Sequence, residues 1–230
     1  MSDRYDLSVI LPVHNEAGGI EDFLTRLDSV LRHEGLLYEI ICVENGSTDR
    51  SYDILLKLTK RLSTLCLVRS TVGWGNAVRK GIEFASARYI CYLVSDGQVD
   101  SATIPILYRE IVAKDLVMIK GFRKNRENIL RRIVSLVYNI LPRLFFGLRS
   151  HDINGTPKLI RSDIVKSMVF TAPNIAFDLE LLLALHTKKY PWIEVPIEGK
   201  RRVWGKSSTT MKTMLEMLGA IFQFRFFPKK

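Results

Sequence analysis

A carboxylate and an amide lie close together in Ser95-Asp96-Gly97-Gln98, directly after an apolar run at residues 89–94. Carboxylate and amide oxygens are hard ligands that suit Mg²⁺ or Mn²⁺. Such ions usually keep several waters and take further oxygens from substrate phosphates, so a small set of protein ligands is enough. Asp100 or Ser101 also suits the N-cap of a following helix, which is compatible with a metal nearby. The sequence therefore predicts a divalent metal site formed by Asp96 and Gln98.

Two further polar loops follow apolar runs nearer the N-terminus. Pro12-Val13-His14-Asn15-Glu16 ends the first run, and Glu44-Asn45-Gly46-Ser47-Thr48-Asp49 follows the second. Carboxylate and amide groups in such loops accept hydrogen bonds from the NH groups of a nucleobase or from ribose hydroxyls. The alternative is that both are ordinary turns whose polar side chains cap helices.

These loops need a scaffold that brings the strand ends together, and the apolar pattern predicts one. Short apolar runs alternate with segments of helical periodicity for about 120 residues. The runs predicted as strands are residues 7–13, 38–43, 65–68, 89–94 and 116–119. This alternation is typical of a parallel sheet covered by helices on both faces, with ligands at the carboxyl ends of the strands. Residues 1–121 are therefore predicted to be a nucleotide-binding half.

The second half of the chain is less regular and contains two interrupted apolar segments. Residues 129–148 are broken by Pro142, and a last helix is predicted from about residue 209 to 227. Basic residues flank both, and neither reaches the roughly 18–20 uninterrupted apolar residues of a membrane span. They suit amphipathic helices in a membrane interface, with core or dimer packing as the alternative. We therefore expect one domain, 1–208, with a second half at 122–208, and a C-terminal amphipathic helix at 209–230.

The composition narrows the class of partner. The 230 residues carry a net charge of +10 and a pI of about 9.6, which favours phosphorylated substrates or an acidic membrane surface. The chain has neither an arginine-rich tract nor zinc-finger spacing, so we expect no nucleic acid partner. Cys42, Cys66 and Cys91 lie in apolar runs and are expected to be buried, reduced thiols. The polar N-terminus argues against a signal peptide, so we expect peripheral association with the cytoplasmic side of a membrane.

Four segments carry a family resemblance: PVHNE at 12–16, VENGSTD at 43–49, GWGNAVRKG at 73–81 and SDGQ at 95–98. In this order they resemble the inverting family 2 glycosyltransferases of the GT-A fold. Within that family the chain looks most like the branch of dolichyl-phosphate mannose synthases and other polyprenyl-phosphate glycosyltransferases. Later blocks of the branch match DINGTPK at 152–158, FDLE at 177–180, and VPI and RVWGKS between 195 and 207. The resemblance covers roughly residues 7–210.

The resemblance implies a GT-A-like, Rossmann-type three-layer α/β/α sandwich with a mostly parallel sheet, plus amphipathic interface helices. Residues 122–208 would then be the acceptor-binding half. The implied reaction is a metal-dependent, inverting transfer of a hexose from GDP-mannose or a UDP-sugar to a polyprenyl or dolichyl phosphate at the membrane surface.

The resemblance also assigns roles to residues, with Mg²⁺ or Mn²⁺ at Asp96 and Gln98. The implied catalytic residues are Asp96, Arg202 and Asp152. The implied contacts of the nucleotide-sugar are Pro12, Val13, His14, Asn15, Glu16, Val43, Glu44, Asn45, Ser95 and Asp96. Arginine forks suit phosphate oxygens. The implied contacts of the acceptor phosphate are Arg123, Arg131, Arg202, Lys206 and Ser207.

Two departures from the family pattern bear on specificity and metal binding. Glu44 and Asn45 stand where the family usually has two aspartates, so the nucleotide base stays open. Val94 stands where the metal motif often has its first aspartate, whereas the second aspartate and the glutamine are kept as Asp96 and Gln98.

Two alternatives to the lipid-phosphate acceptor stay open. An acceptor phosphate is already ionised near neutral pH, whereas a sugar hydroxyl of a cell-surface glycan needs a general base, from Asp152, Asp178 or Glu180. A non-catalytic nucleotide-binding scaffold with the same fold is the other reading. A homo-oligomer or a small membrane-anchor subunit also stays open.

Overall fold

The computed structural model of the chain describes residues 5–123, 129–199 and 211–227, without the side chains of 129–137, 211, 212 and 214. The first half consists of β1 (Tyr5–Val13), α1 (Ile20–His33), β2 (Tyr38–Glu44), α2 (Ser51–Leu58), β3 (Leu65–Arg69), α3 (Trp74–Phe84), β4 (Ala87–Tyr92) and α4 (Thr103–Ala113). The second half consists of β5 (Met118–Arg123), α5 (Ile129–Phe146), β6 (Lys158–Arg161), α6 (Ser162–Lys166), α7 (Ala176–Thr187), β7 (Trp192–Ile197) and α8 (Met211–Phe226). The predicted alternation of strands and helices in the first half is confirmed.

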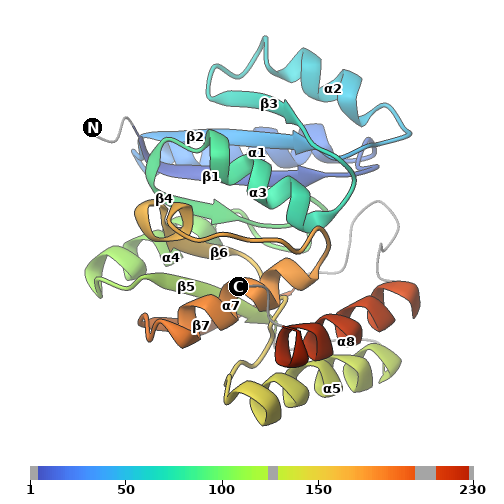
Figure 1. Cartoon of the computed structure of the whole chain (residues 1–230). Coiled ribbons are helices and arrows are strands. Elements are labelled where there is room, and N and C mark those ends of the chain that lie inside the picture. The colour runs from blue at the N-terminus through green and yellow to red at the C-terminus, as the bar shows by residue number, and fades with distance from the viewer. Residues whose placement is uncertain (1–4, 124–128, 200–210, 228–230) are drawn as a thin grey trace.

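The strands of the described residues form one seven-stranded sheet in the order β3-β2-β1-β4-β6-β5-β7 (Figure 1). Neighbouring strands are parallel except at β6, which runs antiparallel to both β4 and β5. The chain builds β2 and β3 on one side of β1 and then places β4 on the other side. Such a switch point opens a crevice at the carboxyl ends of the two central strands, where ligands bind in open α/β sheets.

Helices cover both faces of the sheet, which gives three layers and two hydrophobic cores. One core lies under α1, α2 and α4, and contains for example Leu24, Leu55 and Leu107. The other lies under α3, α5, α6, α7 and α8, and contains Val78 and Leu182. The central strands β1 and β4 contribute to both cores, which explains their nearly continuous apolar runs. The expected three-layer α/β/α sandwich with a mostly parallel sheet is confirmed.

Two glycines of the GWGNAVRKG segment allow α3 to pack closely on its surroundings. A Cβ atom on Gly75 would lie 2.2 Å from the carbonyl oxygen of Ala172, and one on Gly81 would lie 2.3 Å from Cγ2 of Ile10. The backbone N–H of Asn76 donates to the carbonyl oxygen of Pro173 (3.1 Å). The start of α3 therefore joins the first half of the chain to the segment that leads into α7.

The second half differs from its prediction at three points. The four-residue strand β6 and the five-residue helix α6 were not predicted, because such short elements carry little periodicity. The strand β5 starts at Met118, two residues later than predicted. Pro142 lies inside α5 instead of breaking it. Packing of Tyr138 and Phe145 against the second core compensates for the backbone hydrogen bond that proline cannot donate.

The last helix, α8, packs against α5 and α7. Its inner face buries Met217, Ala220 and Ile221 in the second core, while Leu215, Phe222 and Phe226 stay exposed. No helix in the described part of the chain has the length and apolar character needed to cross a bilayer.

Candidate active site

The polar loops after β1, β2 and β4 meet at one edge of the sheet, as predicted. The backbone N–H of Asn45 donates to the carbonyl oxygen of Val13 (2.9 Å), which joins the ends of β2 and β1. The Ser95 hydroxyl donates to the carbonyl oxygen of Pro12 (3.1 Å), which joins the segment after β4 to β1. The carboxyl ends of β1, β2 and β4 are therefore bordered by residues that the sequence singled out for nucleotide binding.

The loop after β1 is held by its own polar side chains. Asn15 adopts a left-handed conformation (φ 57°), which asparagine tolerates better than most residues. Its Oδ1 accepts the backbone N–H of Thr48 (2.8 Å), and the backbone N–H of Glu16 donates to the Ser51 hydroxyl (2.9 Å). Asn15 and Glu16 thus take part in bonds that fix the loop after β1 against the loop after β2.

Glu44 and Asn45 are buried and also bind neighbouring loops. One oxygen of Glu44 accepts the backbone N–H of Ser47, and the other accepts Nε of Arg69 at 3.2 Å. Asn45 Oδ1 accepts the backbone N–H of Gly73 (2.9 Å), where α3 begins. His14 is exposed at the rim, with Nδ1 2.8 Å from the carbonyl oxygen of Asn45. Contact with the nucleotide-sugar stays a prediction for all ten residues that were expected to bind it. The observed bonds give a structural role to Asn15, Glu16, Glu44 and Asn45.

Asp96 is buried at the end of the segment that follows β4, with 2% of its surface exposed. Its Oδ1 accepts the backbone N–H of Gln98 (3.0 Å) across Gly97, whose φ of 74° favours glycine. The tight turn at Gly97 therefore holds the backbone of Gln98 against the Asp96 carboxylate. The predicted side-chain cap is wrong, because α4 begins at Thr103 with Ala102 as its N-cap residue and without a side-chain cap bond; Asp100 Oδ1 instead accepts the backbone N–H of Ala102 (3.1 Å) in the turn before the helix.

The ligand chemistry of this turn fits a Mg²⁺ or Mn²⁺ ion that is shared with a diphosphate. In the described residues no group of three or more His, Cys, Asp and Glu side chains could hold a metal. One carboxylate and one amide oxygen leave most coordination positions to water and phosphate oxygens, as magnesium sites for nucleotides usually do. Asp96 and Gln98 are therefore the residues that would hold the ion.

In the second half, Arg123 and Asp152 form a pair. Arg123 ends β5, and its Nε lies 3.2 Å from Oδ2 of Asp152, whose side chain is only 4% exposed. Asp152 is thereby placed to orient the Arg123 guanidinium. The side chain of Arg131, and Arg202, Lys206 and Ser207 altogether, lie outside the described residues, so their predicted contacts with an acceptor phosphate stay predictions.

The other two carboxylates considered as bases are occupied by structural bonds. Asp178 Oδ1 accepts the Lys158 ammonium (2.6 Å) and the Tyr92 hydroxyl (2.8 Å) in the second core. The Glu180 carboxylate accepts the backbone N–H groups of Thr171 and Ala172 at 2.9–3.0 Å. Each therefore stabilises the segment or core around it and is poorly placed to take a proton from an acceptor.

A row of polar side chains crosses four neighbouring strands of the sheet. This row was not predicted from the sequence. Tyr92, Lys158, Lys120 and Glu194 are register partners on β4, β6, β5 and β7. Both lysines are fully buried, and Lys120 Nζ lies 2.7 Å from Oε1 of Glu194. Burial lowers the pKa of Lys158 to about 8, although Asp178 opposes the shift. The signal in the sequence is weak, because Lys120 follows the apolar run 116–119 whereas Lys158 follows a polar, loop-like segment and precedes two apolar residues.

Glu194 makes the stability of the protein depend on pH in a defined window. Burial alone would raise its pKa, but the Lys120 charge and hydrogen bonds from Lys120, Ser150 and His151 outweigh burial and lower the pKa from 4.5 to about 2. Because the folded-state pKa is the lower one, the stabilisation is fully present above about pH 4.5 and is lost as pH falls towards 2. The shift corresponds to roughly 3 kcal/mol.

We therefore expect Glu194→Gln to lower the free energy of unfolding at pH 7 and to lower it much less at pH 3. Urea denaturation of both proteins at the two pH values measures this difference. A deficit of equal size at pH 3 and pH 7 would contradict the assigned pKa shift.

Comparisons with known proteins match most of the chain. The family model described as glycosyl transferase family 2 matches residues 8–169. The chain is 26% identical to a dodecaprenyl-phosphate galacturonate synthase of Rhizobium johnstonii, over 96% of this chain and 68% of that protein. It is 25% identical to a dolichol-phosphate mannosyltransferase of Pyrococcus furiosus, over 94% of this chain and 63% of that protein. The chain thus spans about two thirds of the length of these curated relatives.

Solved structures share the fold. A glucosyl-3-phosphoglycerate synthase from Mycobacterium tuberculosis, crystallised with Mn²⁺, uridine diphosphate and phosphoglyceric acid, superposes with a TM-score of 0.79 at 17% identity, over 98% of this chain and 80% of that chain. The structure of the same enzyme with Mg²⁺ and uridine diphosphate superposes with a TM-score of 0.78. The expected GT-A-like fold is confirmed by this likeness.

Proposed function

The chain belongs to glycosyl transferase family 2, and from this premise we propose that it transfers a hexose from a nucleotide-sugar to a polyprenyl phosphate at a membrane surface. One observation favours this acceptor over a sugar hydroxyl. The carboxylates considered as general bases are already bound: Asp152 to Arg123, Asp178 to Lys158, and Glu180 to backbone N–H groups. A phosphate acceptor needs no base, because it is ionised near neutral pH. The curated relatives named above carry a prenyl phosphate in their names.

The proposed reaction is a single displacement with inversion. An oxygen of the acceptor phosphate forms a bond to the anomeric carbon, and the bond from that carbon to the nucleoside diphosphate breaks, so that its electron pair leaves with the diphosphate. Arg123, held by Asp152, stabilises the acceptor phosphate, and Arg131, Arg202, Lys206 and Ser207 are proposed to join it. A divalent ion held by Asp96 and Gln98 would supply positive charge to the diphosphate.

The sugar donor is proposed to bind at the switch point, between the loops after β1, β2 and β4. Buried Glu44 and Asn45 would border the base and exposed His14 its outer side. A UDP-sugar and GDP-mannose both remain candidates. The solved neighbours contain uridine diphosphate, which favours testing a UDP-sugar first.

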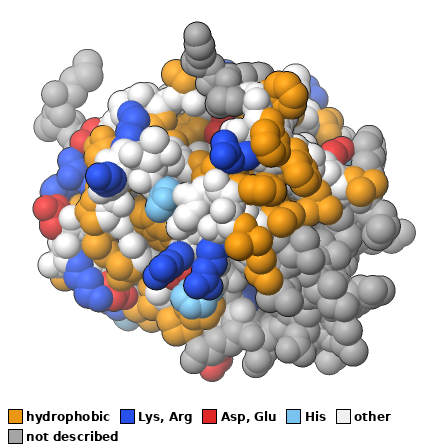
Figure 2. Space-filling view, turned by 60° about the horizontal axis from the view of Figure 1, so that its bottom comes forward, with side chains coloured by type: hydrophobic (Ala, Val, Ile, Leu, Met, Phe, Trp, Pro, Cys, Tyr) orange, Lys and Arg blue, Asp and Glu red, His pale blue; other side chains and the backbone are white. Residues whose placement is uncertain are grey.

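A membrane surface is proposed to contact the outer face formed by α5, α8 and the residue after it. Figure 2 views the molecule from this side and shows a broad hydrophobic patch with Lys and Arg side chains near it. The exposed large hydrophobic side chains of these helices are Ile140, Leu144, Leu215, Phe222, Phe226 and Phe227. Patches of this kind, bordered by basic residues such as Arg143 and Arg225, suit an anionic lipid surface.

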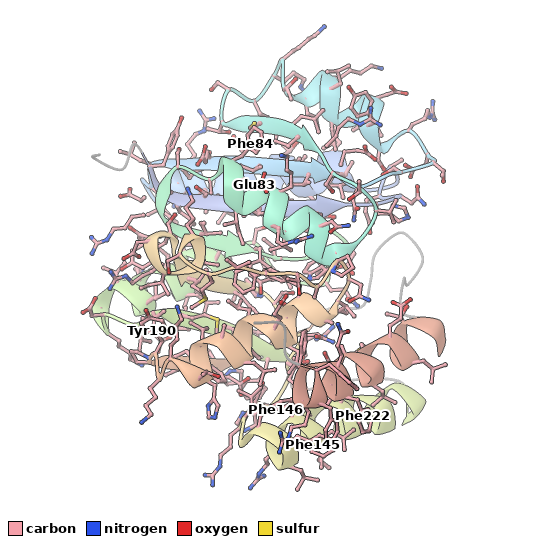
Figure 3. The ribbon with its side chains drawn as sticks, viewed as in Figure 1. Glu83, Phe84, Phe145, Phe146, Tyr190 and Phe222 are labelled. Carbon is pink, nitrogen blue, oxygen red and sulfur yellow. The ribbon has the colours of Figure 1, made fainter. Side chains whose placement is uncertain are left out.

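The rings of this face are packed together rather than scattered. Phe145 and Phe222 have centroids 5.7 Å apart, and Phe226 lies 6.3 Å from each of them. Figure 3 shows Phe145 and Phe222 close together where α5 meets α8. These packed rings form one continuous aromatic surface on α5, which belongs to the proposed acceptor half, and on α8. Such a surface would let a polyprenyl chain stay in the bilayer while its phosphate reaches Arg123.

The proposed function is tested by incubating the protein with Mg²⁺, a panel of nucleotide-sugars and polyprenyl phosphate in liposomes. We expect one glycolipid whose mass equals the polyprenyl phosphate plus one hexose unit, with the opposite anomeric configuration to the sugar donor. Transfer to a glycan hydroxyl without any glycolipid would support the alternative acceptor. Nucleotide binding without hydrolysis or transfer would support the scaffold reading.

A further inference from the structure

We propose that Glu194 is a positioning residue for the acceptor phosphate, because it holds in place the segment from which Asp152 orients Arg123. This inference rests on the proposed function, in which Arg123 contacts that phosphate. It concerns a residue on β7 that carries no motif of the family resemblance and that acts through its neighbours.

Both oxygens of the Glu194 carboxylate are bound to the segment before Asp152 or to β5. Oε1 accepts the Ser150 hydroxyl (2.6 Å) and the Lys120 ammonium (2.7 Å). Oε2 accepts the backbone N–H of His151 (2.7 Å) and lies 2.6 Å from Nδ1 of the same residue. The Glu194 side chain is only 7% exposed and Lys120 is fully buried, so the bond between them forms away from solvent, where charge-assisted bonds are strong, whereas the His151 side chain is 73% exposed.

The same segment is held from two other elements. Lys120 on β5 donates to the backbone carbonyl oxygen of Asp152. Asn139 on α5 donates to the carbonyl oxygen of His151 (3.0 Å) and accepts the backbone N–H of Ile153 (3.1 Å). The backbone on both sides of Asp152 is therefore fixed, and Glu194 contributes through both Lys120 and His151.

A fixed Asp152 matters because, within the described residues, the Arg123 side chain is held at the end of β5 by its pair with Asp152. The side chain of Arg123 is 29% exposed, and the Asp152 pair is made through Nε. The His151 ring also stacks on Phe122, the neighbour of Arg123, with centroids 4.8 Å apart. Loss of the Glu194 bonds would let Asp152 and Phe122 move together, and misplacement of a phosphate-binding fork by about 1 Å is costly for catalysis.

The neighbouring lysine of the polar row provides a matched control. Lys158 is as buried as Lys120 and has its own carboxylate, Asp178, which makes no contact with residues 150–152 among the bonds described. Glu194→Gln and Asp178→Asn are both isosteric, and each leaves a buried lysine without its carboxylate. Both are expected to lower stability, because breaking one side of a buried ion pair is destabilising.

Steady-state kinetics with a short-chain polyprenyl phosphate separates the two variants. We expect Glu194→Gln to raise KM for the acceptor about tenfold and to leave KM for the nucleotide-sugar within about twofold. Hydrogen exchange at the N–H groups of His151 and Ile153 should become faster. Asp178→Asn should change neither KM nor exchange at these positions. An acceptor KM that rises equally in both variants would overturn the inference.

Surface variants decide the question if Glu194→Gln fails to fold. His151→Phe keeps the aromatic stack on Phe122 but removes the side-chain bond to Glu194, and Ser150→Ala removes the hydroxyl bond. Each should raise the acceptor KM about threefold, as loss of a single hydrogen bond does; unchanged values in both would count against positioning.

Arg123→Ala distinguishes failure of this inference from failure of the proposed function. If Arg123→Ala raises the acceptor KM and the Glu194, His151 and Ser150 variants do not, only the positioning role is wrong. If Arg123→Ala also leaves the acceptor KM unchanged, the assignment of the acceptor phosphate is wrong, and the positioning role falls with it.

Discussion

Asp96→Asn is expected to lower the rate of sugar transfer at least about 100-fold while the protein stays folded. Asparagine has the same shape, and its oxygen still accepts the backbone N–H of Gln98 that the aspartate accepts in the turn. What is lost is the negative charge of a side chain that is 2% exposed at the carboxyl end of the central strands. Without it a divalent ion binds weakly, and the charge on the departing diphosphate is less well neutralised.

Initial rates measured against Mg²⁺ or Mn²⁺ concentration test this expectation. EDTA should abolish transfer by the parent protein, and either ion should restore it. Binding of Mn²⁺ in the presence of nucleoside diphosphate, measured by electron paramagnetic resonance, provides a readout that does not depend on activity.

Asp100→Asn is the matched control, because Asp100 is an exposed carboxylate in the same loop whose described bond is to the backbone N–H of Ala102. Its rate and its Mn²⁺ affinity should stay close to those of the parent. Full activity of Asp96→Asn, or an equal loss in Asp100→Asn, would rule out the metal assignment.

The sequence predicts the first half of the molecule well because β1, β2 and β4 are largely buried parallel strands; β3 lies at the edge of the sheet, and Cys66, which was expected to be buried, is exposed there. In buried parallel strands most residues are apolar until the strand ends, so the position of the polar loop after it is visible directly. That is why the loops beginning at His14, Glu44 and Ser95 are found at the same edge of the sheet. The order of strands that brings β1 and β4 together follows from the usual topology of such alternating chains.

The second half is less predictable because its functional contacts depend on an antiparallel strand and on pairs far apart in the chain. Lys120 looks like a misplaced charge at the end of an apolar run, Lys158 looks like the end of a loop, and nothing local shows that they are neighbours across β5 and β6. The carboxylates that compensate them, Glu194 and Asp178, lie on β7 and α7. A buried charge is acceptable only with such a partner, and the partner is visible only in three dimensions.

The same limit explains why sequence reasoning left the general base open. The motifs that contain Asp152, Asp178 and Glu180 match the family about equally well. From the sequence alone, a structural carboxylate that accepts backbone N–H groups cannot be distinguished from a catalytic one. The geometry separates them, because Glu180 binds the segment before α7 and Asp178 binds a buried lysine.

The exposed hydrophobic side chains on the outer face of α5 and α8 predict that the protein binds membranes through this face. Leu144, Phe226 and Phe227 are 72%, 58% and 76% exposed. Complete burial of such a side chain contributes roughly 1.5–3 kcal/mol, so partial insertion of three of them stabilises the bound state by several kcal/mol. We expect Leu144→Ser, Phe226→Ser and Phe227→Ser combined to lower the liposome partition coefficient about 100-fold or more.

Point substitutions are preferable to removal of the tail, because α8 also buries Met217, Ala220 and Ile221 in the second core. Deleting residues 211–230 would expose that core and confuse loss of membrane binding with loss of stability. The three exposed side chains make few core contacts, so their replacement should leave the unfolding temperature within a few degrees of the parent.

The control replaces three equally exposed hydrophobic side chains elsewhere on the molecule, at Leu37, Val72 and Val169. Flotation with liposomes that contain anionic lipid should be lost in the α5–α8 variant and kept in the control. The α5–α8 variant should also show a raised KM for a long-chain polyprenyl phosphate in liposomes and an unchanged KM for a short-chain, water-soluble one, because only the first requires the protein at the surface. Equal flotation of both variants would contradict the proposed contact of this face with lipid.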